Sequence, residues 1–214
     1  RVIPMLPEKL SNKVCSLRPN EEKLTFSVSV KIDKKGNIKD HWFGRTIINS
    51  NYRFSYQEAQ EIIDTKQNTI SKKKSLTGKQ YKVEDQVVDA VLIMDSIAKE
   101  VRKKREAKGS INFNKKEVYF KLDENKNPTD VLLKESKDAN KLIEEFMLIA
   151  NKKVAELFTQ IKKQNYIYRV HDLPDNEKLK SLKYIVKSFG YTLDLTSSKG
   201  ISKSLNKLLN NIRG

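Results

Sequence analysis

The positions of apolar residues along the chain predict two long amphipathic helices. Between residues 84 and 108, apolar side chains recur at the three- and four-residue spacing of a helix face, and Gly109 follows as a natural end. Arg105 continues the same apolar stripe. Residues 137–163 carry a second continuous apolar face. The apolar positions are Val87, Ala90, Val91, Met94, Ile97, Ala98 and Val101 in the first helix, and Ala139, Leu142, Phe146, Ala150, Val154, Leu157 and Ile161 among others in the second.

Alternating apolar and polar residues predict a β-hairpin in the first quarter of the chain. Phe26, Val28, Val30 and Ile32 fall on one face of its first strand, and Gly36 lies in the turn. Several shorter segments also have the composition of strands. The predicted strands are residues 25–32, 38–48, 110–113, 117–122, 130–134 and 166–170.

Capping residues define the shorter helices. Ser55 precedes Glu58 by three residues, the spacing of a capping box, while Asp175 and Gly190 mark the start and end of a later helix. The shorter predicted helices are residues 55–64, 176–189 and 201–212. Residues 1–24 hold three of the five prolines without periodicity, so we expect an irregular segment, and the polar, Lys-rich residues 65–82 predict a flexible basic loop. Together the elements predict an α+β fold in one domain, with long amphipathic helices packed on a mixed, curved sheet.

The charge of the chain points to a polyanionic partner. Its 214 residues contain 43 Lys and Arg against 27 Asp and Glu, a net charge of +16, which favours nucleic acid. A Lys-rich solvated surface would give the same balance. No apolar run is long enough for a membrane span, so we expect a soluble, cytoplasmic protein. One cysteine and two histidines exclude an internal disulfide and a Cys/His zinc site.

Motifs for nucleotide binding and nucleophilic catalysis are absent from the sequence. The glycines form no phosphate-binding loop, and neither histidine lies in a triad context. A two-metal site needs several converging carboxylates. The densest acidic group is Asp172, Asp175 and Glu177, but helix capping explains Asp175 better.

Two adjacent glutamates differ in their position on the second long helix. Glu144 and Glu145 point about 100° apart. Glu145 lies opposite the apolar face, where we expect solvent, whereas Glu144 lies at its margin with Asn140 and Asn151. Glu144 is either a polar border residue or a carboxylate held rigidly enough to bind a ligand hydroxyl.

Five ordered motifs resemble one family of nucleases. They are PMLPEKLSNKVCSL (residues 4–17), SNYRFSY (50–56), REAKGSINF (105–113), LIEEFMLIAN (142–151) and YRVHDLPDNEKL (168–179). In this order and spacing they resemble the RNB catalytic domain of the bacterial ribonuclease II and ribonuclease R family, and are nearer to ribonuclease R. The resemblance implies a processive 3′ to 5′ exoribonuclease that draws single-stranded RNA into a basic channel and uses Mg²⁺.

The resemblance also assigns roles to individual residues. Phe113 matches an aromatic residue that stacks on a base near the 3′ end, and Glu144 matches a carboxylate that contacts the sugar of the terminal nucleotides. Lys108 stands where the family usually has Arg, and Arg105 and Lys108 are expected to face RNA phosphate in the channel. An internal carboxylate such as Glu100 or Glu106 is the weaker alternative as partner for Arg105.

The family's aspartate cluster and its Ser-Pro-Ile-Arg-Arg motif do not occur in this sequence. We therefore expect residues 1–214 to be a middle portion of one RNB-like catalytic domain, without catalytic residues or metal ligands of its own, from a monomeric protein that does not bind membranes. A noncatalytic basic RNA-binding module is the alternative function. A third possibility, a scaffold with a Lys-rich surface, predicts no salt-dependent affinity for RNA.

Overall fold

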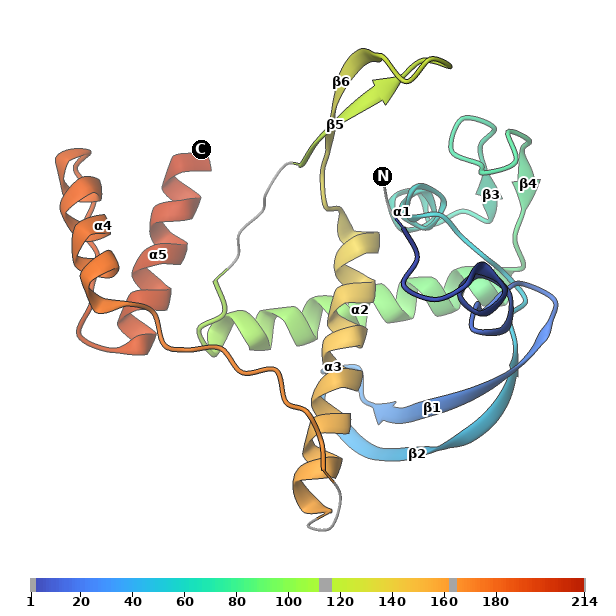
Figure 1. Cartoon of the computed structure of the whole chain (residues 1–214), viewed down its shortest axis with the longest axis horizontal. Helices are drawn as coiled ribbons and strands as arrows, with labels where there is room; N and C mark the ends of the chain where they lie inside the picture. Colours follow the sequence, from blue (N-terminus) through green and yellow to red (C-terminus); the bar gives the residue numbers. More distant parts are fainter. Residues whose placement is uncertain (1–2, 112–116, 162–164, 214) are drawn as a thin grey trace. The chain divides into compact units, whose positions relative to one another are not determined.

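The first part of the chain is built on the predicted hairpin. The computed structural model describes residues 3–111, 117–161 and 165–213 (Figure 1). The chain divides into two units, Arg1–Ile97 and Ala98–Gly214. In the first unit, β1 (Glu22–Ile32) pairs antiparallel with β2 (Ile38–Asn49). The hairpin is confirmed. A π-helix, η1 (Lys9–Val14), lies in the segment that was expected to be irregular.

The capping box of the next helix is also confirmed. In α1 (Tyr56–Thr65) the Ser55 hydroxyl accepts from the Glu58 amide at 3.2 Å, and the Glu58 carboxylate accepts from the Ser55 amide at 2.7 Å. Two short strands, β3 (Thr69–Ile70) and β4 (Tyr81–Lys82), then pair antiparallel. Ile62 and Ile70 are fully buried. The predicted loop 65–82 therefore contains two short paired strands, β3 and β4, and the buried side chain of Ile70. Its flexibility stays a prediction.

Both long helices lie close to their predicted bounds. The helix α2 (Asp85–Ala107) contains the boundary between the two units, and α3 (Asp138–Gln160) belongs to the second unit. Between them, β5 (Glu117–Leu122) pairs antiparallel with β6 (Pro128–Lys134). The helical periodicity of the sequence correctly identified α2 and α3, and strand-like composition correctly identified β5 and β6.

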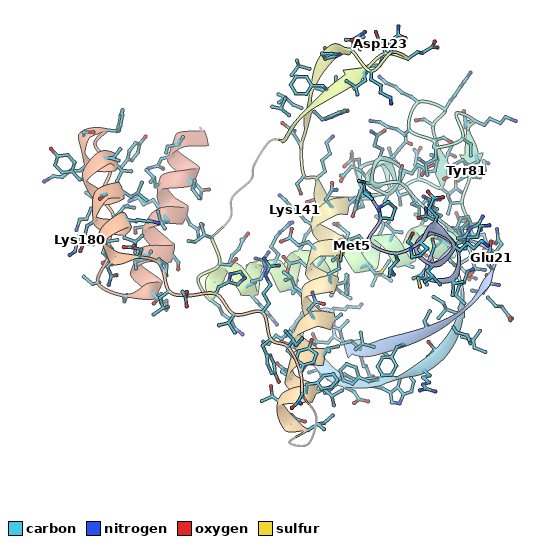
Figure 2. All side chains as sticks on the ribbon, viewed as in Figure 1. Met5, Glu21, Tyr81, Asp123, Lys141 and Lys180 are labelled. Atoms are coloured by element: carbon cyan, nitrogen blue, oxygen red, sulfur yellow. The ribbon has the colours of Figure 1, made fainter. Side chains whose placement is uncertain are left out.

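The last two helices share a small apolar core. The helices α4 (Asn176–Ser188) and α5 (Ser198–Arg213) bury Val186, Leu193 and Leu208. The Asp175 side chain caps α4 by accepting from the amides of Glu177 and Lys178 at 2.8 and 3.2 Å, as predicted. Lys180 lies on the exposed side of α4 (Figure 2).

Two expectations about the strands are wrong, although the α+β class is confirmed. The described strands form three separate two-stranded sheets and not one curved sheet. Residues 166–170 form no strand, because their aromatic side chains pack on α3 instead. The Tyr166 ring stacks on Phe158 with centroids 4.5 Å apart, and the Tyr168 hydroxyl lies 3.0 Å from that of Thr159. Every helix in the described ranges is too short or too polar to cross a bilayer.

Candidate functional site

The predicted glycine stop of α2 positions the first site residue. The Ser110 amide donates to the Arg105 carbonyl at 3.3 Å, and the Gly109 amide donates to the Glu106 carbonyl at 2.9 Å. These two bonds form a Schellman motif, which needs a left-handed residue after the helix, and Gly109 supplies it with φ 104°. Arg105 therefore lies in the last turn of α2, beside a sharp change in chain direction.

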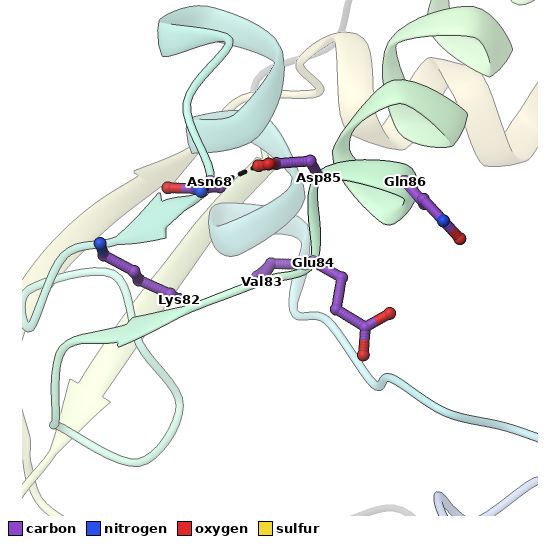
Figure 3. A pocket seen from close by; sticks show the side chains of 6 residues that line it. All are labelled: Asn68, Lys82, Val83, Glu84, Asp85 and Gln86. Atoms are coloured by element: carbon purple, nitrogen blue, oxygen red, sulfur yellow. Dashed lines mark hydrogen bonds between the residues drawn. The ribbon is translucent and has the colours of Figure 1, made fainter.

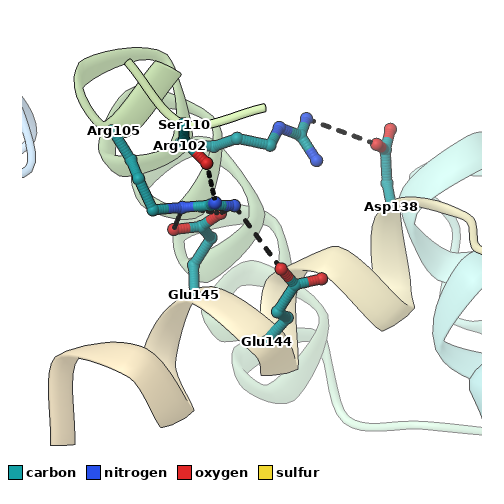
Figure 4. Close-up of polar contacts among 6 residues, drawn as sticks. All are labelled: Arg102, Arg105, Ser110, Asp138, Glu144 and Glu145. Carbon is teal, nitrogen blue, oxygen red and sulfur yellow. Dashed lines mark hydrogen bonds and ion pairs between the residues drawn. The ribbon is translucent and has the colours of Figure 1, made fainter. Parts of the chain in front are cut away.

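Arg105 forms an ion pair with Glu145 of α3 (Figure 4). Its Nε atom lies 3.2 Å from both carboxylate oxygens of Glu145, and its Nη2 atom lies 2.5 Å from Oε1. Glu145 is only 1% exposed. Hydrogen bonding to Glu145 raises the pKa of Arg105, against the opposing effect of burial. The pair is therefore a charged contact of the second unit in which Glu145 is buried and the Arg105 side chain is 35% exposed.

The structure corrects the expected positions of the two glutamates. Glu145 was expected in solvent, but it is buried against Arg105. The side chain of Glu144 is 55% exposed, and its carboxylate accepts one long hydrogen bond, at 3.4 Å, from Arg105 Nη2. The helical wheel misplaced Glu145 because it considers only neighbours on the same helix, whereas a side chain from α2 covers this position.

The expected partner of Arg105 also needs correction. The sequence favours RNA phosphate as the partner of Arg105 over Glu100 or Glu106 of the same helix. The partner in the structure is Glu145, from α3. The Arg105 Nη1 atom donates to the Ser110 hydroxyl at 2.6 Å. Because an Arg side chain has five N–H groups in a fixed fork, little donor capacity remains for a phosphate.

This ion pair also holds the turn that follows α2. Ser110, bound to Arg105 through its hydroxyl, accepts a hydrogen bond at its carbonyl from Asn206 of α5 at 2.9 Å. Sequence reasoning assigned no role to Glu145, Ser110 or Asn206. The only signal for the ion pair was the presence of opposite charges on two long helices.

A second group of charges joins α2 to the start of α3. Lys99 Nζ lies 3.1 Å from the carboxylate of Asp138, in the first turn of α3. Arg102 Nη2 lies 3.7 Å from the same carboxylate (Figure 4). The positive end of the α3 helix dipole also stabilises the negative charge of Asp138. The two ion-pair groups both join α2 to α3, the helix that carries Glu144.

The other two predicted site residues are Lys108 and Phe113. Lys108, at the end of α2, is exposed. Phe113 lies outside the described residues, as does half of the predicted strand 110–113. Arg105 and Glu144 are therefore the predicted residues that the structure brings together.

The described residues do not provide a metal site. No group of three or more Asp, Glu, His and Cys side chains among them could hold a metal ion. In the densest acidic segment, the Asp175 carboxylate caps α4. Glu145 is occupied by Arg105. We therefore derive no catalytic step through a metal held by these residues.

The first unit contains an open pocket at the start of α2 (Figure 3). Asn68 Nδ2 donates to Asp85 Oδ1 across it at 2.9 Å. Arg105, Lys108 and Glu144 do not line it. Its lining mixes one cation with two carboxylates and is not typical of a phosphate-binding site; the lining residues are Asn68, Lys82, Val83, Glu84, Asp85 and Gln86.

Comparison with known proteins gives consistent matches. DIS3-like exonuclease 2 of Schizosaccharomyces pombe is 37% identical over 97% of this chain, and ribonuclease R of Aquifex aeolicus is 36% identical over 89%. The chain spans 22% and 25% of the lengths of these two relatives. An Arabidopsis thaliana protein described as inactive exonuclease DIS3L2 is 34% identical over the whole chain.

A solved structure and a family match agree with these relatives. The structure of Mycoplasma genitalium RNase R in complex with ribose methylated single-stranded RNA superimposes with a TM-score of 0.82 and 28% identity, over 99% of this chain and 32% of that one. The RNB domain matches residues 1–214. This match covers every residue, and the chain therefore belongs to the RNB domain family.

Proposed function

We propose that the intact protein is a 3′ to 5′ exoribonuclease that hydrolyses single-stranded RNA with Mg²⁺, and that this chain supplies part of its RNA-binding surface. The observation that carries the proposal is the RNB domain match over residues 1–214. Relatives named as exonucleases and the likeness to an RNA-bound RNase R support it. The net charge of +16 suits a polyphosphate substrate.

Within this function, Glu144 is the group best placed to contact the sugar of a terminal nucleotide. Its side chain is 55% exposed and accepts one long hydrogen bond from Arg105. A carboxylate has about four acceptor positions, so most of its capacity is free for ligand hydroxyl groups. A bond to the 2′-hydroxyl would select RNA over DNA.

Arg105 then acts mainly as a positioning residue. Glu145 neutralises its charge, and the guanidinium holds Glu144 on one side and Ser110 on the other. Lys108 is exposed at the end of the same helix and can attract a phosphate as a point charge. The stacking of Phe113 on a base stays a prediction.

No carboxylate group among the described residues fits a metal ion. The metal of this proposed reaction would therefore be bound by other residues. When bound, a divalent ion would activate water and neutralise charge on the scissile phosphate. The contribution of this chain is to hold the RNA. A cytoplasmic location and a monomeric state stay predictions.

The test uses the intact protein and a 5′-labelled single-stranded RNA. We expect stepwise shortening from the 3′ end in Mg²⁺ and none in EDTA. A Glu144→Gln variant should bind and shorten RNA less well, and should lose part of the discrimination against DNA of the same sequence. Shortening that starts at the 5′ end, or internal cleavage, would contradict the proposal.

A noncatalytic RNA-binding module is the second candidate function. It is favoured by the 34% identity to a relative described as inactive. In the same experiment it predicts salt-dependent RNA binding without shortening. Absence of any salt-dependent binding would instead indicate a scaffold with a solvated Lys-rich surface.

A further inference from the structure

The loop that joins β3 and β4 carries a group of exposed lysines. Lys72, Lys73, Lys74 and Lys79 are all exposed. None of them takes part in the ion pairs found within the described ranges. Figure 1 shows this connection as a loop beyond the paired ends of the two strands. The chain therefore presents concentrated positive charge at one place.

The nearby carboxylates bind the backbone of the loop and not its lysines. Glu61 Oε2 accepts from the Ser71 amide at 3.0 Å. Glu58 Oε1 accepts from the Leu76 amide and from the Tyr81 hydroxyl, each at 3.0 Å, and Glu58 is only 1% exposed. These two glutamates tie down both sides of the Lys72–Lys74 turn and leave the ammonium groups available for an external anion.

The backbone of the loop is further ordered by its own hydrogen bonds. The Ser71 carbonyl accepts from the amides of Lys74 and Ser75, at 3.1 and 3.0 Å. Ile70, next to Ser71, is fully buried. A ligand would therefore have to order the Lys side chains but not the backbone, and this lowers the entropic cost of binding.

We propose that Lys72, Lys73 and Lys74 form a second contact surface for the phosphate backbone of RNA, separate from the site around Glu144. This inference rests on the proposed function of the intact protein. Consecutive side chains in a turn fan out, and lysines act as point charges. The surface therefore suits a flexible strand held without sequence preference. Leu76 is 61% exposed beside the lysines, but a single apolar side chain anchors a membrane weakly.

The test compares two variants of the intact protein that lower the net charge equally. One is Lys72→Gln, Lys73→Gln and Lys74→Gln; the control removes three exposed lysines of α5, Lys199→Gln, Lys203→Gln and Lys207→Gln. Binding is measured in EDTA by fluorescence anisotropy, with labelled single-stranded RNAs of about 5 and about 30 nucleotides, over a range of salt concentrations.

At 0.1 M salt the loop variant should bind the long RNA about fivefold more weakly for each phosphate that it no longer neutralises, and its log-salt slope should be flatter by about 0.7 per phosphate. Its loss of affinity for the short RNA should be smaller, because a short strand offers fewer phosphates to the lysines. Replacing the same three lysines by Arg should preserve binding, and unfolding temperatures should match the wild type.

Two results would overturn the proposal. One is equal loss of affinity in the loop and α5 variants, which would indicate a general charge effect. The other is unchanged RNA binding together with loss of binding to vesicles of acidic lipid, which would assign the loop to a membrane. If the wild-type protein binds no RNA, the proposed function itself fails, and the two failures are thus distinguishable.

Discussion

Glu144 and Glu145 show how neighbouring residues of one type take different roles. Their side chains leave the helix about 100° apart, so only one can face Arg105 from within the fold. Glu145 lies there and is buried, whereas Glu144 keeps most of its surface in solvent. A buried charge requires a partner, because desolvation without one is costly. Glu145 is therefore a structural residue, and Glu144 is the one that can meet a ligand.

Substituting each glutamate by Gln tests this division. Glu145→Gln removes the buried counter-charge of Arg105 and leaves only its long contact with the exposed Glu144. We therefore expect the free energy of unfolding to fall by about 3 kcal/mol. Glu144→Gln removes an exposed charge and should cost less than about 1 kcal/mol. Urea unfolding of both variants gives the comparison. Equal costs, or a larger cost for Glu144, would contradict the assignment.

Glu58 makes the stability of the chain depend on pH. Burial alone would raise its pKa, but hydrogen bonds from the amides of Ser55 and Leu76 and from the Tyr81 hydroxyl outweigh it and hold the pKa below its ordinary value of 4.5. Burial, together with the hydrogen bond to Glu58, raises the pKa of Tyr81 to about 12. Because the folded pKa of Glu58 is the lower one, its stabilising effect is complete above pH 4.5 and is lost as the pH falls.

A Glu58→Gln variant should therefore be less stable than the wild type at pH 7, and the difference should shrink below about pH 4. The measurement is the urea midpoint at a series of pH values. Tyr81→Phe is the control, because it removes one hydrogen bond and keeps the carboxylate; it should cost about 1 kcal/mol. If the urea midpoints of the wild type and of Glu58→Gln differ by a constant amount down to about pH 3, this carboxylate does not cause the loss of stability in acid.

At the level of elements, the end of α2 depends on one glycine. Gly109 has φ 104°, and a Cβ atom there would lie 3.1 Å from the Ser202 hydroxyl of α5. Gly109→Ala should therefore cost about 2 to 3 kcal/mol, from backbone strain and crowding together. Gly78→Ala is a matched control, with φ 67° and open space around the added carbon; strain alone should cost about 1 kcal/mol. Thermal unfolding of both variants gives the comparison; the extra loss at Gly109 reports crowding together with the greater backbone strain at φ 104°, and equal losses would exclude crowding against Ser202.

Most elements could be predicted because their signals are local. The capping box at Ser55 and the N-cap at Asp175 act within a few residues, and the apolar stripes of α2 and α3 reflect a period within one helix. The strand predicted at 166–170 failed for the opposite reason. A strand needs a partner elsewhere in the chain, and Tyr166 packs on Phe158 instead.

The site was only partly predictable for the same reason. Glu144 and Arg105 were singled out, but their connection was not, because it depends on which faces of α2 and α3 meet. Glu145 shows the limit most clearly, since nothing in its own helix indicates that a cation covers it. The network through Ser110 to Asn206 joins residues 96 positions apart, a distance that no periodicity reports.

At the scale of the whole molecule, net charge and the placement of carboxylates bear on different parts of the proposed function. The net charge of +16 attracts RNA at long range. The carboxylates that the fold positions most firmly have other partners: Glu58 binds loop amides, Glu145 binds Arg105, and Asp175 caps α4. Within the described parts of the chain, no metal-binding group remains.

We therefore predict that the purified 214-residue chain binds single-stranded RNA but does not shorten it in Mg²⁺. Water activation by metal ions needs converging carboxylates, and supplying more metal cannot replace them. The measurement is gel analysis of labelled RNA over a range of Mg²⁺ concentrations, beside anisotropy binding curves for the same preparation. A mock purification from cells that do not produce the chain reveals contaminating nuclease, because a contaminant would act equally in both samples. Stepwise shortening by the wild-type chain alone would show that a metal site forms within these residues after all.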